Sequence, residues 1–129
     1  MTEVTLLITA LLFGGMTLYS FGFAAFVFSA LPAQTAGPLI RKAFPHFYLF
    51  VLATSALAAG LASLFDLRTA LILALVALTT VFARQILMPA INAATDSGKK
   101  RRFAQLHGLS VAITLGHIAA VGYVLVTVV

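Results

Sequence analysis

Cysteine is absent from the 129 residues of this chain. Its absence excludes disulfide bonds, thiolate metal sites and cysteine nucleophiles. The sequence also has no nucleophile elbow, no phosphate-binding P-loop and no paired carboxylates, so it carries no catalytic motif of a hydrolase or a nucleotide enzyme. We therefore assign no catalytic residues and expect a protein that is not an enzyme.

Charged residues are scarce: they make up 9% of the chain, whereas hydrophobic residues make up 62%. The mean hydropathy is +1.11. A soluble domain needs more polar surface than this, so lipid must be the solvent for most of the chain. The length fits one compact bundle, and we expect residues 1–129 to form a single domain.

Four long apolar stretches predict an all-α fold, an integral membrane bundle of four transmembrane helices. The first helix is expected to be retained, because the start of the chain lacks the basic region of a signal peptide. Pro32 and Pro89 are expected to end the first helix and to perturb or end the third. The predicted helices cover residues 4–31, 46–65, 67–88 and 103–129.

Three connections join these helices. Asp66 opens a tight turn and is a good N-cap for the third helix. Gly98 marks the exposed tip of the last connection. The other two connections are predicted as a loop over residues 32–45, with room for a short amphipathic piece, and a polar stretch over residues 89–102.

Positive charge is concentrated in the first and third connections, which hold Arg41, Lys42 and the basic run at residues 99–102. The opposite side holds only Arg68. The positive-inside rule therefore places both basic connections in the cytoplasm and both termini in the periplasm of a bacterial inner membrane. This topology explains the net charge of +5, so we exclude nucleic acid as a partner. The expected partners are the lipid bilayer and either further copies of the chain or other membrane subunits.

Polar side chains on the last helix form a stripe. His107, Ser110, Thr114 and His117 fall within an arc of about 80° at helical spacing. Such a stripe should face the bundle interior, where it serves interhelical hydrogen bonding or ligand binding. His117 lies about 15 Å deeper than His107, near mid-membrane. We expect Tyr19, Thr114 and His117 to form a mid-membrane polar layer, with Tyr19 as the direct partner of His117.

A second polar cluster is predicted near the cytoplasmic face. Arg84 either snorkels to the interface or turns inward to pair with Asp96 or an anionic ligand. The candidate metal ligands are His46, His107 and His117. The predicted cluster consists of His46, Arg84, Asn92, Asp96, His107 and Ser110.

Three segments together resemble the transmembrane protein 205-like family, also called domain of unknown function 4149. They are Phe-Pro-His-Phe-Tyr at residues 44–48, Pro89 with Asn92, and Arg-Phe-Ala-Gln-Leu-His-Gly-Leu-Ser at residues 102–110. The resemblance implies a four-helix membrane domain with no established reaction. The member for which the family is named is associated with resistance to platinum drugs, which suggests metal or xenobiotic handling. His107, Ser110, Pro89 and Asn92 are carried over as motif positions, without assigned chemistry.

These observations predict a small, non-enzymatic membrane protein: a transport-associated, metal- or xenobiotic-handling or accessory subunit. The alternative is a haem-binding membrane redox protein, since the size, helix count and helix-borne histidines are similar to those of the copper-resistance D and HemJ types. His46 and His107 would then ligate haem. A third hypothesis is proton or ion relay through His117, although the membrane spans offer no carboxylate as its partner.

Overall fold

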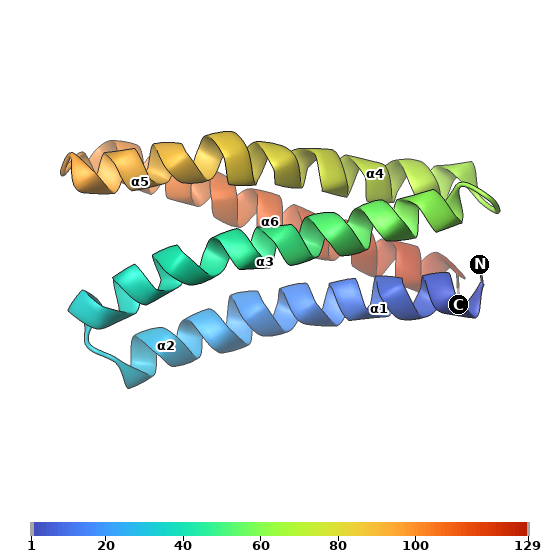
Figure 1. The fold of residues 1–129 in the computed structure, drawn as a ribbon, viewed down its shortest axis with the longest axis horizontal. Coiled ribbons are helices and arrows are strands. Elements are labelled where there is room, and N and C mark those ends of the chain that lie inside the picture. The colour runs from blue at the N-terminus through green and yellow to red at the C-terminus, as the bar shows by residue number, and fades with distance from the viewer. Residues whose placement is uncertain (1, 129) are drawn as a thin grey trace.

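The computed structural model describes residues 2–128, which form four antiparallel helical rods and contain no strand (Figure 1). Each rod is long and apolar enough to cross a membrane, which confirms the predicted all-α integral membrane fold. The predicted end of the last helix at residue 129 lies outside the described residues. The rods, called the first to fourth spans, are α1 (Glu3–Thr17), η1 (Leu18–Phe23) and α2 (Ala24–Ala30); α3 (Ala33–Ala62); α4 (Leu67–Phe82), η2 (Ala83–Leu87) and α5 (Met88–Asp96); and α6 (Lys100–Val128).

The second span is longer than predicted. It begins at Ala33, so the predicted loop over residues 32–45 is wrong, and the first two spans are joined only by Leu31 and Pro32. Pro38 and Pro45 lie inside α3 without ending it. Membrane helices tolerate proline because neighbouring helices satisfy the freed backbone groups. The carbonyl oxygen of Pro45 also accepts a hydrogen bond from Nε of Arg84 at 3.2 Å, which links the second and third spans.

The third span is also longer than predicted, since it continues through Pro89 to Asp96. The π-helical turn η2 comes directly before Pro89. A wider turn there relieves the clash between a proline ring and the carbonyl group four residues earlier. The fourth span begins at Lys100, so the predicted connection over residues 89–102 shrinks to residues 97–99. Gly98 adopts a positive φ of 68° at its tip, a conformation that favours glycine.

The turn between the second and third spans confirms the predicted cap. The carboxylate of Asp66 accepts hydrogen bonds from the backbone N–H of Arg68 at 3.1 Å and from the hydroxyl of Thr69 at 2.6 Å. These hydrogen bonds, that from Thr69 foremost, hold the pKa of Asp66 below its ordinary value. The turn lies at the same end of the bundle as both ends of the described chain, which we call the terminal end (Figure 1).

The core is packed most closely in the terminal half of the bundle. Leu12, Met16, Val51, Leu73 and Val121 come from all four spans and are at most 1% exposed. The backbone of Gly15 leaves room for the ring of Phe50, since a Cβ atom there would lie 2.5 Å from the ring. The hydroxyls of Thr9, Ser55 and Thr80 are buried too, and each donates to the carbonyl oxygen four residues earlier. These three buried hydroxyls are therefore satisfied within their own helices.

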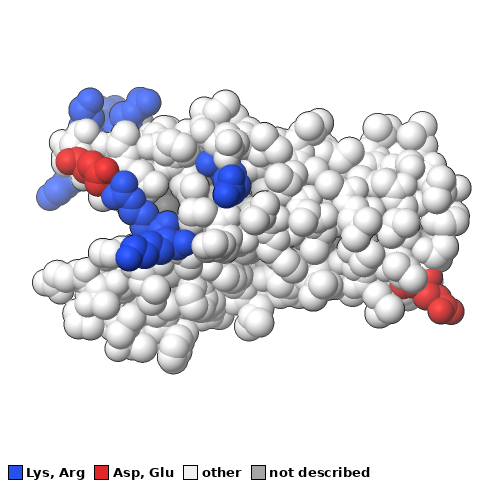
Figure 2. Space-filling model, in the orientation of Figure 1, with Lys and Arg blue, Asp and Glu red and all other residues white. Residues whose placement is uncertain are grey.

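At the other end the rods diverge. The segment α2 and the first turns of α3 separate from α5 and the start of α6 (Figure 1). Figure 2 shows the Lys and Arg side chains gathered at this end, around a hollow in the surface. We call it the basic end. The candidate site lies in the space between these diverging helices.

Candidate functional site

A cavity of about 670 Å³ opens between α2 and α3 on one side and α5 and α6 on the other. We call it the basic-end cavity. Three cations line it: Arg41, Lys99 and Lys100. Its polar lining residues include Asn92, Thr95, His107 and Ser110, and the larger apolar ones are Phe28, Ile40, Phe44, Met88, Ile91 and Phe103.

A cluster of aromatic rings closes the cavity toward the core. The ring of Tyr19 in η1 stacks on Phe47 of α3, with ring centroids 4.7 Å apart, and meets Phe44 edge-on at 5.6 Å. Phe44 and Tyr48 also pack together and both line the cavity. Spacings of three and four residues place Phe44, Phe47 and Tyr48 on one face of α3. This packing accounts for the aromatic residues in the segment at 44–48.

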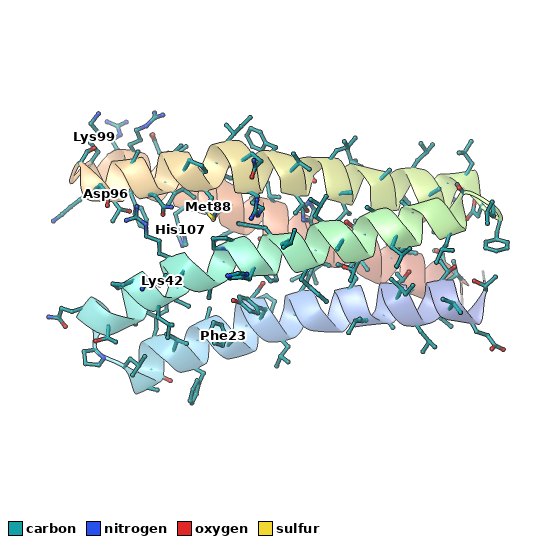
Figure 3. All side chains as sticks on the ribbon, in the orientation of Figure 1. Phe23, Lys42, Met88, Asp96, Lys99 and His107 are labelled. Carbon is teal, nitrogen blue, oxygen red and sulfur yellow. The ribbon has the colours of Figure 1, made fainter. Side chains whose placement is uncertain are left out.

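His107 projects into the space between α6 and α3, near Met88 (Figure 3). Its ring lies parallel to that of Phe103 one turn earlier, with centroids 5.4 Å apart. The hydroxyl of Ser110 donates to the backbone carbonyl oxygen of His107 at 2.7 Å. Asn92 joins these residues from α5. Three residues of the predicted polar cluster, Asn92, His107 and Ser110, are therefore brought together in one wall of the cavity.

The other three residues of that cluster lie elsewhere. His46 is exposed and does not line the cavity. Arg84 is half-buried and donates to Pro45 rather than to Asp96. Asp96 instead accepts from both Nη atoms of Arg41, at 2.7 and 2.9 Å. The predicted pairing of Arg84 with Asp96 is wrong, because Arg41 on the facing helix already occupies both carboxylate oxygens.

His117 forms an interhelical hydrogen bond at mid-depth. Its Nε2 lies 2.5 Å from the hydroxyl oxygen of Thr79 on α4. The tautomer of His117 sets which of the two groups donates, and the Thr79 hydroxyl also lies 2.8 Å from the carbonyl oxygen of Leu75 in its own helix. The predicted contact between His117 and Tyr19 is wrong, because the ring of Tyr19 turns toward α3. Thr114 is half-buried one turn from His117, and the predicted polar layer reduces to the pair of Thr79 and His117.

The candidate metal ligands are not assembled. Within residues 2–128, no group of three His, Asp or Glu side chains is placed to hold a metal ion. Of His46 and His107, the predicted haem ligands, only His107 lines the cavity.

Sequence reasoning missed the pairing of Arg41 with Asp96. Arg41 lies on α3 and not in the predicted loop, and it meets a carboxylate 55 positions away. No pattern in a single sequence marks a pair at that separation. The lone acidic residue among the cations of this end, Asp96, is the one available signal.

A family model described as domain of unknown function (DUF4149) matches residues 7–100, from α1 to the start of α6. No curated protein and no solved structure is significantly similar to the chain. The match confirms the domain of unknown function 4149 for the part that contains residues 44–48, Pro89 and Asn92. The segment at residues 102–110, which contributes to the resemblance, lies outside it.

Proposed function

The chain belongs to the family of domain of unknown function 4149, and for this membrane domain we propose a binding role, in which the basic-end cavity takes up an amphiphilic small molecule. In this role the protein is non-enzymatic, forms a single domain and acts as a transport-associated or xenobiotic-handling subunit. The cavity is the observation that carries the proposal. Its volume falls within the range of about 300–1,000 Å³ that is typical of small-molecule sites.

The depth of the cavity suits a ligand that comes from the membrane. About 20 helical residues cross the hydrocarbon layer. Counted from the terminal end, the third span reaches the opposite headgroup level near Met88, and the fourth span reaches it near Gly108. Residues near both positions line the cavity. Its apolar wall therefore meets the edge of the hydrocarbon layer, and its cations lie among the headgroups.

We propose that the basic end faces the cytoplasm and the terminal end faces the periplasm of a bacterial inner membrane, as the charge bias requires. Single cysteines at Ser97 and Ser63, which are exposed at opposite ends, test this topology in a chain without native cysteine. An impermeant maleimide should label Ser97→Cys only in inside-out vesicles and Ser63→Cys only in right-side-out vesicles. The reverse pattern would contradict the orientation.

We also propose that α6 contacts a second copy of the chain or another membrane subunit. It is the least buried of the four spans. Gly108, Ala112 and Gly116 lie four residues apart along it, and a Cβ atom at either glycine would meet nothing within 4 Å. Small residues at this spacing allow close approach of a second helix. Crosslinking through Ala112→Cys should yield dimers in native membranes, and monomers alone would count against the contact.

The absence of tryptophan from the chain permits a direct binding test. Phe103→Trp places a fluorophore in the cavity wall, and Phe26→Trp places one on the exposed side of α2. The quencher is the methyl ester of a dibrominated fatty acid, an uncharged amphiphile, added to vesicles that contain the protein. Binding predicts saturable quenching of the cavity tryptophan and unsaturable quenching of the lipid-facing one.

Two glycines of α3 supply matched controls for this test. Gly37 lines the cavity and Gly60 does not, and a Cβ atom at either would meet nothing within 4 Å. Gly37→Leu should fill the cavity and abolish saturable quenching, whereas Gly60→Leu should leave it unchanged. Equal quenching of the two tryptophans, or equal effects of the two leucines, would contradict the proposal.

A haem-binding redox protein is the second candidate, because His107 and Met88 both line the cavity. An imidazole and a thioether are one axial ligand set of haem iron. The test is the visible spectrum of protein purified from its native membrane, oxidised and reduced. A Soret band that disappears in His107→Ala and shifts in Met88→Leu would favour haem over the amphiphile, and a featureless spectrum would exclude it.

A further inference from the structure

We propose that the molecule taken up by the basic-end cavity is an anionic amphiphile whose carboxylate or phosphate head replaces Asp96 as the partner of Arg41. This inference rests on the proposed function and adds the chemical class of the ligand and the contact that recognises it.

All charged side chains that line the cavity are positive. Arg41, Lys99 and Lys100 line it, and its lining contains no carboxylate. Asp96 is the only acidic residue at this end of the chain, since Glu3 and Asp66 lie at the terminal end. Figure 2 shows the cations around the hollow. A cavity with low-dielectric walls and cations of one sign attracts anions.

Among residues 2–128, Arg41 alone both lines the cavity and holds Asp96, which it does through two parallel hydrogen bonds. This fork geometry binds any carboxylate or phosphate that presents two oxygens. The two side chains are 44% and 60% exposed. An ion pair as exposed as this contributes little to stability. An incoming anionic head therefore exchanges with Asp96 at little cost to the fold.

The remainder of the ligand must be apolar. Below the level of Arg41, the cavity presents Phe44, Met88 and Ile91. Lys99 and Lys100 stand at the rim, where the turn at Gly98 directs the chain back into α6. An ion without an apolar body would leave this wall uncovered. The arrangement therefore fits a head at the rim and a chain or ring system below it.

The test compares a dibrominated fatty acid with its methyl ester, in phosphatidylcholine vesicles, at a pH where the acid is ionised. Quenching of Phe103→Trp reports binding. The acid should bind about tenfold more tightly than the ester, the factor expected of one charge-assisted contact. Arg41→Gln should remove that preference, so that the acid and the ester bind with similar affinity. Asp96→Asn, which removes the competing carboxylate, should strengthen acid binding severalfold.

Charge controls lie at the terminal end. Asp66→Asn changes the net charge by the same amount as Asp96→Asn, and Arg68→Gln changes it by the same amount as Arg41→Gln. Positions 66 and 68 are remote from the cavity. Asparagine also remains a good N-cap at position 66. Neither control should alter the preference for the acid. If a control changed binding as much as its partner variant, the effect would be one of overall charge and the inference would be overturned.

The remaining outcomes separate this inference from the proposed function. If neither the acid nor the ester quenched saturably, the proposed function would fail together with the inference. If both bound equally, the cavity would bind amphiphiles but the role of Arg41 would be overturned. An acid preference that Asp96→Asn leaves unaltered would overturn the exchange. Competition by phosphatidylglycerol would support an anionic head supplied by a resident lipid, whereas competition by inorganic phosphate alone would overturn the need for an apolar body.

Discussion

The two halves of the bundle use the same four spans differently. In the terminal half, large side chains from every span meet at a closed core, and buried hydroxyls bond to their own helices. In the basic half the rods diverge, an aromatic cluster separates the core from a cavity, and cations line the space. The comparison indicates that the two halves have different roles: the terminal half stabilises the fold, and the basic half provides a binding site.

The largest expected effect is on the closed core. Leu73 is fully buried, so Leu73→Ala should destabilise the protein by about 2–5 kcal/mol through lost contacts and a new void. Ile91 lines an existing cavity, and Ile91→Ala should cost much less. Unfolding of both variants in one detergent mixture measures the difference. Equal losses would show that the two halves contribute alike to stability.

A smaller effect is expected at mid-depth. Thr79→Val removes the hydroxyl that bonds to His117 and should cost about 0.6 kcal/mol, the average for interhelical hydrogen bonds in a membrane protein, and at most about 1.7 kcal/mol. Thr95 at the basic end donates only to the carbonyl oxygen of Ile91 in its own helix, at 3.0 Å. Thr95→Val is thus the matched control, with an expected change near zero. A cost for Thr95→Val as large as that for Thr79→Val would contradict the assigned roles.

The smallest effect concerns pH at the turn of the terminal end. The pKa of Asp66 is lowered in the folded protein, chiefly by the hydrogen bond from Thr69. Its stabilising contribution is therefore complete above the ordinary pKa of 3.8 and is lost as the pH falls through the lowered value. Asp66→Asn should remove this part of the acid sensitivity. Unfolding followed between neutral and strongly acidic pH tests it, and identical acid profiles for the two proteins would contradict it.

The sequence predicts the number of spans, the cap at Asp66 and the tip at Gly98, because hydropathy and turn chemistry are local properties. It misplaces the start of the second span and the end of the third. Proline commonly ends a helix in water, but Pro38, Pro45 and Pro89 lie inside continuous helical spans here, as membrane helices tolerate.

The candidate site is harder to predict than the fold. Asn92, His107 and Ser110 can be grouped from the sequence, because helical spacing and depth along the membrane can be counted, and all three line the cavity. The partners of Tyr19, Asp96 and His117 depend instead on the rotation of each helix about its axis. Apolar residues on every side of these helices leave that rotation undetermined by periodicity.

The most direct measurement uses two conservative cysteines in a chain that has none. Ser110 lines the basic-end cavity, whereas Ser55 is fully buried in the closed core. An impermeant maleimide applied from the basic side should modify Ser110→Cys and spare Ser55→Cys, and a fatty acid should protect Ser110→Cys better than its methyl ester does. Equal reactivity of the two cysteines, or no protection by either compound, would contradict an open basic half that binds an anionic amphiphile.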